Sequence, residues 1–285
     1  MELLLLGLCI KRTGCDYTSK DKAMMRSLYT ATTGMLGQQL HIDNTSNNIA
    51  NVNTTGYKKQ RAEFADLFYQ VLQYAGTSTS ETTISPTGIE VGIGVRPVAI
   101  QKMFSQGHPK ETENNLDVAI TGNGFFQIEL PDGNIAYTRA GSFKLDNNGN
   151  VVNAEGYRLI PELTIPEGAT QINIGTDGTV SVIEGNQTEV NVLGQIEIVT
   201  FINPAGLHSL GDNLFINTNA SGDPVAGVPG LDGFGQLRQG FLELSNVKLV
   251  EEMTDLITGQ RAYEANSKTI QTADSMLQTV NGLKR

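Results

Sequence analysis

Two matched apolar repeats, one near each end of the 285-residue chain, constrain the fold more than any other feature. Near the N-terminus, an interval of seven residues separates Leu28, Met35, Ile42 and Ile49. Near the C-terminus, the same interval separates Leu249, Leu256, Tyr263, Ile270 and Leu277. A repeat of seven is typical of helices that pair in a coiled coil. The pattern predicts that the chain leaves a coiled coil, builds something else, and returns to it.

Both repeats lie in segments that favour long helices. No proline occurs between Ser27 and Gly56, and a glycine in the left-handed conformation commonly closes a helix. We therefore expect an N-terminal helix over residues 25–56, with Gly56 as its cap, and a C-terminal helix over residues 245–285. Together they would form an inner coiled-coil domain.

The residues between the two repeats have a β pattern. In "GIEVGIGV", four β-branched residues from Ile89 to Val95 alternate with glycine or charged residues, as in a half-buried strand. Residues 131–134 and 146–150 have the composition of hairpin turns. The sequence predicts an α+β fold in which the paired helices flank short antiparallel strands arranged as a sandwich or barrel.

We expect the β region to have two parts. Residues 57–106 and 229–244 would form a connecting β-rich segment, and residues 107–228 an outer β domain. The remaining residues, 1–24, match neither repeat and are expected to be a mis-assigned start. The working chain would then begin at Met24 or Met25.

The composition limits the classes of partner. The formal net charge is −10, and no basic stripe with interleaved aromatic residues occurs, which argues against nucleic acid and anionic membrane surfaces. The apolar run Leu3–Ile10 is too short for membrane insertion and lacks the features of a cleaved signal peptide. Both cysteines, Cys9 and Cys15, lie near the start, so no disulfide can link the main body.

No arrangement of residues indicates catalytic or metal chemistry. His41, His108 and His208 are isolated, and none lies in a ligand spacing such as HExxH. The adjacent Glu251 and Glu252 point in different directions on a helix, which favours a solvated face over acid–base catalysis. We expect no enzymatic activity, no cofactor and no metal site.

The N-terminal helical segment is rich in asparagine. One stripe, roughly opposite the apolar repeat, contains Asn44, Asn47, Asn48 and Asn51. Asp43 is the only formally charged residue between Ser27 and Tyr57, whereas solvent-facing helices are normally rich in charge. A helix of this composition should also be unstable alone. We therefore interpret the stripe as an intersubunit amide face, and the chain as a filament subunit whose ends fold on assembly.

Three long blocks resemble one protein family. "SLYTATTGMLGQQLHIDNTSNNIANVNTTGYKK" resembles the N-terminal signature of bacterial flagellar rod and hook proteins, and "NNLDVAITGNGFFQI" and "QGFLELSNVKLVEEMTDLITGQRAYEANSKTI" resemble their central and C-terminal blocks. The resemblance covers essentially residues 25–285. Within Ser85–Gly107, a pattern similar to that of distal rod members of the family includes Pro86, Gly88, Gly92, Gly94 and Val95.

The resemblance implies a structural subunit of the distal rod. Such a subunit polymerises into a rigid helical tube in the periplasm, transmits torque from motor to hook and lines the export channel. The implied partners are further copies of the chain, proximal rod proteins, hook-side axial proteins, the surrounding basal-body rings and the type III export apparatus, which exports the chain without a cleaved signal. The alternatives are a proximal rod or hook subunit, or a secreted β-rich carbohydrate-active or carbohydrate-binding protein.

The segment Gln73–Val95 is extended and poor in apolar residues at its start, so we expect it to order against adjacent subunits and brace the tube. Deleting Thr77–Glu90 is expected to soften the filament without abolishing polymerisation.

Limited proteolysis with mass spectrometry tests the expectation that the ends fold on assembly. The dilute monomer should lose the residues before about Gly56 and after about Asn246, whereas the same protein in isolated basal bodies should keep both ends. Protease-resistant ends in the dilute monomer would contradict this expectation.

Overall fold

The structure, a computed structural model, describes the backbone of residues 15–76, 86–185 and 190–282. Within these ranges it describes side chains from Met25 onward, except at positions 280 and 281. The chain divides into two compact units. We call one the helical unit: Met1–Ser46, Arg61–Gln101 and Val250–Arg285. The other, the β unit, consists of Asn47–Gln60 and Lys102–Leu249. The proposal that residues 1–24 are a mis-assigned start falls largely outside the described residues.

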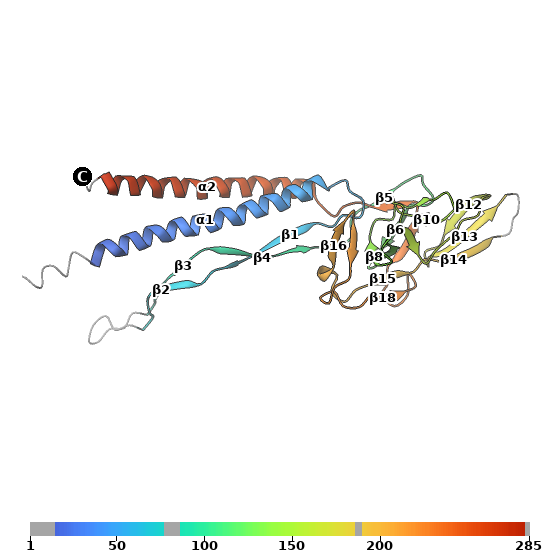
Figure 1. Ribbon diagram of the computed structural model, residues 1–285, viewed down its shortest axis with the longest axis horizontal. Coiled ribbons are helices and arrows are strands. Elements are labelled where there is room, and N and C mark those ends of the chain that lie inside the picture. Colours follow the sequence, from blue (N-terminus) through green and yellow to red (C-terminus); the bar gives the residue numbers. More distant parts are fainter. Residues whose placement is uncertain (1–14, 77–85, 186–189, 283–285) are drawn as a thin grey trace, which may run out of the picture. The chain divides into compact units, whose positions relative to one another are not determined.

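The helical unit contains most of two long helices and four strands (Figure 1). The helices are α1 (Cys15–Ala50) and α2 (Leu249–Gly282). The strands are β1 (Gln60–Asp66), β2 (Tyr69–Gln73), β3 (Ile89–Gly92) and β4 (Val95–Lys102). Two-stranded sheets join β1 to β4 and β2 to β3.

The two helices run antiparallel and contact each other. A Cβ at Gly259 would lie 3.2 Å from Ile42 Cγ1, and one at Gly34 would lie 2.9 Å from Asn266 Nδ2. The later residue of α1 thus lies beside the earlier residue of α2, as expected for antiparallel helices. The small side chains at these two positions allow the close approach.

The β unit contains the remaining strands. They are β5 (Pro109–Glu111), β6 (Val118–Thr121), β7 (Phe126–Glu129), β8 (Ile135–Thr138), β9 (Lys144–Leu145), β10 (Val151–Val152), β11 (Arg158–Ile160), β12 (Ala169–Ile174), β13 (Thr179–Glu184), β14 (Asn191–Gln195), β15 (Ile198–Thr200), β16 (His208–Gly211), β17 (Leu214–Ile216), β18 (Val225–Gly227), β19 (Gln236–Gln239) and β20 (Phe241–Glu243). A short 3₁₀ helix, Pro204–Gly206, lies between β15 and β16.

These strands form several antiparallel sheets. The largest has seven strands in the order β16-β17-β8-β7-β11-β10-β9, and a three-stranded sheet has the order β12-β13-β14. Pairs join β15 to β18, β19 to β6 and β20 to β5. The chain therefore has an α+β fold in which one helix precedes and one helix follows a mainly β region.

The two hairpin turns expected from the sequence are confirmed. Leu130 N donates to Asn134 O at 2.9 Å in the turn between β7 and β8. Asp146 N donates to Asn150 O at 2.9 Å between β9 and β10. The strand expected in "GIEVGIGV" is wrong in its extent, because Gly94, with a φ of 137°, separates β3 from β4.

The expected helix ends also need correction. α1 ends at Ala50, where Val52 N donates to Ile49 O at 3.2 Å and the chain turns. Gly56 has a positive φ of 72°, but its N–H donates to Glu243 O at 2.8 Å instead of capping a helix. α2 begins at Leu249 rather than at residue 245.

The expected domain boundaries differ from the two compact units. Residues 229–244 belong to the β unit, since β19 pairs with β6 and β20 pairs with β5. Residues 47–60, which include the last turn of α1, also belong to it.

The apolar core lies in the β unit. Its largest cluster contains Val118, Ile120, Phe126, Phe143, Val151, Leu159, Leu163, Ile165, Ile174, Val180, Val182, Ile196, Ile198 and Leu237. A second cluster is built on edge-to-face rings, such as Phe125 with Phe201 at 5.8 Å between centroids. Among the described side chains of the helical unit, Ala31 and Ala273 are the only buried apolar residues. The β unit can therefore be stable by itself, whereas the helical unit has little apolar burial to stabilise it.

Phe126→Ala tests where the stability resides. Phe126 is fully buried and its ring meets that of Phe143 at 5.1 Å, so the substitution should lower the free energy of unfolding by about 3–5 kcal/mol. The matched control is Phe68→Ala, because Phe68 is 88% exposed and its loss should change the monomer by no more than about 0.5 kcal/mol. Urea denaturation of both variants measures the difference, and equal losses would contradict the assignment of the core.

Candidate functional site

A buried ion cluster lies in the β unit around Glu243, at the end of β20. The side chain of Glu243 is 1% exposed and its carboxylate accepts three hydrogen bonds. Lys58 Nζ donates to Oε1 at 2.7 Å and Arg139 Nε to Oε2 at 2.6 Å. The backbone N–H of Gly107 also donates to Oε1, at 2.7 Å. Charge-assisted hydrogen bonds of this kind are stronger than neutral ones.

Backbone carbonyls accept the remaining hydrogen bonds of the two cations. Lys58 Nζ donates to Ser105 O at 2.8 Å. The Arg139 guanidinium donates to the carbonyl oxygens of Ile120, Gly122 and Gly124. Such a carbonyl shell compensates for the desolvation of a second cation beside a single carboxylate.

The cluster shifts the pKa values of its members. Burial lowers the pKa of Lys58, since the charged ammonium is removed from water, although the Glu243 carboxylate opposes this effect. For Glu243, burial alone would raise the pKa, but Arg139 and Lys58 together hold it below its ordinary value. Glu243 is therefore ionised at neutral pH.

The same cluster joins the segments that lead to and from the two helices. Lys59 N donates to Asn246 Oδ1 at 2.7 Å, and Asn246 Nδ2 donates to Met103 O at 2.8 Å. With the bond from Gly56 N to Glu243 O, these contacts tie together residues 56–59, 103–107 and 243–246. α1 ends shortly before the first of these segments and α2 begins shortly after the last.

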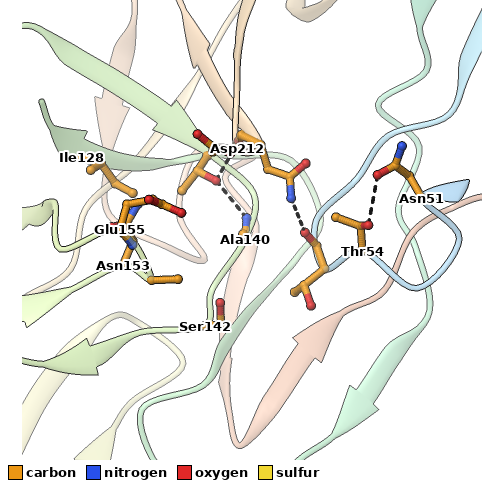
Figure 2. A pocket seen from close by; sticks show the side chains of 12 residues that line it. Asn51, Thr54, Ile128, Ala140, Ser142, Asn153, Glu155 and Asp212 are labelled. Atoms are coloured by element: carbon orange, nitrogen blue, oxygen red, sulfur yellow. Dashed lines mark hydrogen bonds between the residues drawn. The ribbon is translucent and has the colours of Figure 1, made fainter. Parts of the chain in front are cut away.

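A polar pocket of about 380 Å³ lies elsewhere in the β unit (Figure 2). It is lined by Asn51, Thr54, Thr55, Ile128, Thr138, Ala140, Ser142, Asn153, Ala154, Glu155, Asp212 and Asn213. Asn213 Nδ2 donates to Thr55 O at 2.9 Å, and Thr138 Oγ1 donates to Asn213 O at 2.9 Å. These bonds hold the turn after α1 against the β8 and β17 region. The lining contains no histidine, cysteine or lysine.

None of the apolar repeat residues is among the fully buried positions of the two helices. Most repeat residues are half-buried, and Leu249 and Tyr263 are exposed. A second set of helix positions lies three residues after the repeat residues and so also recurs every seven residues. Most of its members are more deeply buried than the repeat residues. On α1 this set is Ala31, Gln38 and Thr45, and on α2 it is Glu252, Gly259, Asn266 and Ala273. The sequence search missed this second set because its members are small or polar.

The asparagine stripe is divided between two environments. Asn48 is buried within its own chain, where its Nδ2 donates to Gln60 O at 2.8 Å and its Oδ1 accepts from Tyr57 Oη and Gln60 N. Asn44 is also buried. Asn47 is exposed and Asn51 is half-buried, with its Nδ2 donating to Asn47 O. Asn44 and Asn48 are thus covered by their own chain, while the assignment of the stripe to an intersubunit amide face stays a prediction.

The distal-rod pattern residues contact their own chain. β3 pairs with β2, and a Cβ at Gly88 would lie 2.6 Å from Gln73 O. Gly94 lies directly against the Thr33 side chain of α1, and Val95 contacts Gly37. Pro86 is exposed, and a Cβ at Gly92 would meet the Tyr69 ring. Residues 86–95 thus contact their own chain, and residues 77–85 lie outside the described part. The expectation that Gln73–Val95 orders against adjacent subunits stays a prediction.

Sequence reasoning did not find the ion cluster. Lys58, Arg139 and Glu243 are far apart along the chain, and charged residues of these types are usually exposed. The only signal was the single carboxylate within the apolar run "GFLEL".

Over the described residues, neither helix is long and apolar enough to cross a membrane. Among the same residues, no group of three or more histidine, cysteine, aspartate or glutamate side chains is placed to hold a metal ion.

Comparison with known protein families matches three parts of the chain. Residues 28–58 match the family described as "Flagella basal body rod protein". Residues 119–182 match "Flagellar hook protein FlgE/F/G D1 domain", and residues 238–283 match "Flagellar basal body rod FlgEFG protein C-terminal". The family matches thus include the N-terminal helix, part of the β unit and the C-terminal helix.

Individual relatives match over most of the chain. The flagellar basal-body rod protein FlgG of Buchnera aphidicola (subsp. Schizaphis graminum) is 50% identical over 91% of this chain and 100% of its own length. The protein of the same name from Borreliella burgdorferi is 52% identical over 92% and 100%. Among solved structures, the flagellar hook protein FlgE2 of Helicobacter pylori matches 65% of this chain and 43% of its own, with 17% identity and a TM-score of 0.23.

These relatives define the chain as a structural protein of the bacterial flagellum. The chain belongs to the flagellar basal-body rod protein family and is a structural subunit of the distal-rod type.

Glu243→Gln tests the ion cluster. The substitution keeps the shape of the side chain but leaves two buried cations without a counter-ion, so the free energy of unfolding should fall by about 3–5 kcal/mol. The matched control is Glu162→Gln, which removes the exposed pair with Arg158 and should cost no more than about 1 kcal/mol. Similar losses in the two variants would show that the cluster does not stabilise the fold.

Acid titration gives an independent test. Because the pKa of Glu243 is lower in the folded state, the unfolded state takes up its proton first, near the ordinary value of 4.5. The stabilisation by Glu243 is therefore complete above that pH and is lost as the pH falls through the lower, folded-state pKa. Urea midpoints measured between pH 6 and 3 should fall less steeply for Glu243→Gln than for the unchanged protein. Parallel pH profiles would contradict the shift.

Proposed function

We propose that the chain polymerises with copies of itself into the rigid helical tube of the distal rod, which transmits torque from motor to hook and lines the export channel. The observation that supports this most is the unequal burial in the two units. The β unit has an extensive apolar core, whereas the two helices, which the rod families match, leave apolar side chains exposed. A subunit with a stable body and weakly packed helices suits folding on assembly.

The helices would pair as a coiled coil in the tube. Their antiparallel contact and the two interlocking sets at intervals of seven support this pairing. Asn47 and Asn51 remain candidates for the intersubunit amide face. The antiparallel sheets of the β unit would form the sandwich-like or barrel-like outer layer of the rod.

The exposed side chains of the β2–β3 hairpin would brace neighbouring subunits. They include Phe68, Tyr69, Leu72, Tyr74 and Ile89. The partners of the assembled rod would be proximal rod proteins, hook-side axial proteins, the basal-body rings and the export apparatus. The location would be the periplasm, reached without a cleaved signal peptide. No enzymatic activity, cofactor, nucleic acid or membrane insertion is part of this function.

The ion cluster would hold together the segments of the β unit that adjoin the two helices in the chain. Torque passed along the chain crosses residues 56–59 and 243–246, and hydrogen bonds of 2.6–2.8 Å hold these segments together. A buried network that has its hydrogen bonds satisfied favours one conformation.

Gly259→Leu tests the proposed helix pairing. A side chain at Gly259 would push against Ile42 and His41, so the helices should separate and the protein should fail to restore motility in a bacterium that lacks its own rod gene. The β unit should keep its urea midpoint, because Gly259 belongs to the helical unit. The matched control is Gly282→Leu, where nothing lies within 4 Å of an added Cβ and motility should be kept.

Two results would overturn the proposal. Failure of the unchanged protein to enter basal bodies would contradict the rod function, and full motility with Gly259→Leu would contradict the helix pairing.

A further inference from the structure

The outer faces of both helices carry apolar side chains along only part of their length. On α1, the face formed by Met25, Tyr29, Thr32 and Leu36 is exposed, and its three apolar members are 53–66% exposed. We call these three residues the α1 patch. They fall within one arc of the helical wheel, since they lie four and seven residues apart.

The corresponding face of α2 has the same organisation. Val250, Met253 and Ile257, which we call the α2 patch, are 52–78% exposed and lie three and four residues apart. Beyond both patches the outer faces become polar. The polar positions include Gln39, Asp43 and Asn47 on α1 and Gln260, Arg261, Glu264 and Gln271 on α2.

The two patches lie at opposite ends of the antiparallel helix pair. Gly34 is close to Asn266 and Gly259 is close to Ile42, so the α1 patch lies beside the C-terminal part of α2. The α2 patch lies beside the C-terminal part of α1. The patch centres are about 16 residues apart along the pair, which is about 24 Å at the helical rise of 1.5 Å per residue. The patches of one chain therefore cannot cover each other.

We infer that the α1 patch of one copy packs against the α2 patch of the next copy, in a head-to-tail contact between helical units. This inference rests on the proposed rod function and specifies which surfaces the copies use. The occupant is a second copy because the chain presents two separate surfaces of the same chemistry and similar length, each two to three turns long. Packing end to end covers both patches at once and leaves the polar parts of the outer faces free.

The contact is heterologous, and repetition of a heterologous contact generates an open filament when the rotation does not close. Each patch has three apolar side chains and is far smaller than a stable protein–protein interface, which buries about 800 Å² on each partner. A single contact should therefore be too weak to dimerise the dilute protein, and many contacts should act together in the rod. Met25 and Met253 bring flexible side chains that can adapt to the opposing patch, including the Tyr29 ring.

Cysteine cross-linking tests the contact in isolated basal bodies. Cys9→Ser and Cys15→Ser first remove the two natural thiols. Leu36→Cys and Ile257→Cys are then made in separate chains, which are produced together in a bacterium that lacks its own rod gene. A disulfide requires Cβ atoms about 3.5–4.5 Å apart, so a cross-linked band with one chain of each kind should form on mild oxidation. Each variant produced alone should lack this band.

Gln271→Cys is the matched control, because Gln271 is exposed on the polar part of the same α2 face. Paired with Leu36→Cys, it should give no band. Equal yields with Gln271→Cys, or bands from Leu36→Cys or Ile257→Cys alone, would overturn the inference. Assembly of the variants without any cross-link would also overturn it while leaving the rod function intact, whereas absence of the Cys-free protein from basal bodies would overturn the rod function itself.

A second measurement does not depend on disulfide geometry. Met253→Ser combined with Ile257→Ser changes exposed positions, so the monomer should keep its urea midpoint. Incorporation into basal bodies should be lost. Gln260→Ser, on the same face outside the patch, should leave incorporation unchanged. Normal incorporation of the double variant would contradict the inference.

Discussion

The carboxylate of Glu243 is the interaction on which the rest of the subunit depends. It pairs with Lys58, from the segment after α1, and with Arg139, from the segment after β8. A buried carboxylate is unfavourable unless cations and N–H groups surround it, and here two cations and the Gly107 N–H do so. Because its partners come from three distant parts of the chain, the cluster forms only when the β unit has its complete topology.

The cluster also explains how one chain can combine a stable body with weakly packed helices. The segments that lead to α1 and α2 are held by charged and amide hydrogen bonds inside the β unit, including those of Asn246. The helices themselves bury few apolar side chains. Stability is therefore concentrated in the β unit, and apolar side chains on the helices remain exposed. The boundaries of a protease-resistant core should accordingly lie near Asn47 and Leu249, somewhat outside those expected from the sequence.

The α+β order, the two long helices, the two hairpin turns and the family could all be predicted from the sequence. These features follow from local periodicity, turn composition and motif order, which act over short distances. The end of α1 could not be predicted, because the conformation of Gly56 serves a contact with Glu243 rather than a helix cap. Asn48 was assigned to a neighbouring copy because its burial by Tyr57 and Gln60 depends on the turn that follows α1.

The sequence by itself determined which segments are helical and which apolar residues recur every seven positions. Only the tertiary structure decided which of those residues are covered, since burial depends on what lies opposite each helix face. It placed Gly259 and Asn266 in the helix contact, left Met253 and Ile257 exposed, and enclosed three distant charges in one site. The physical reason is that periodicity records the chemistry of a face, whereas desolvation of that face depends on residues far away in the chain.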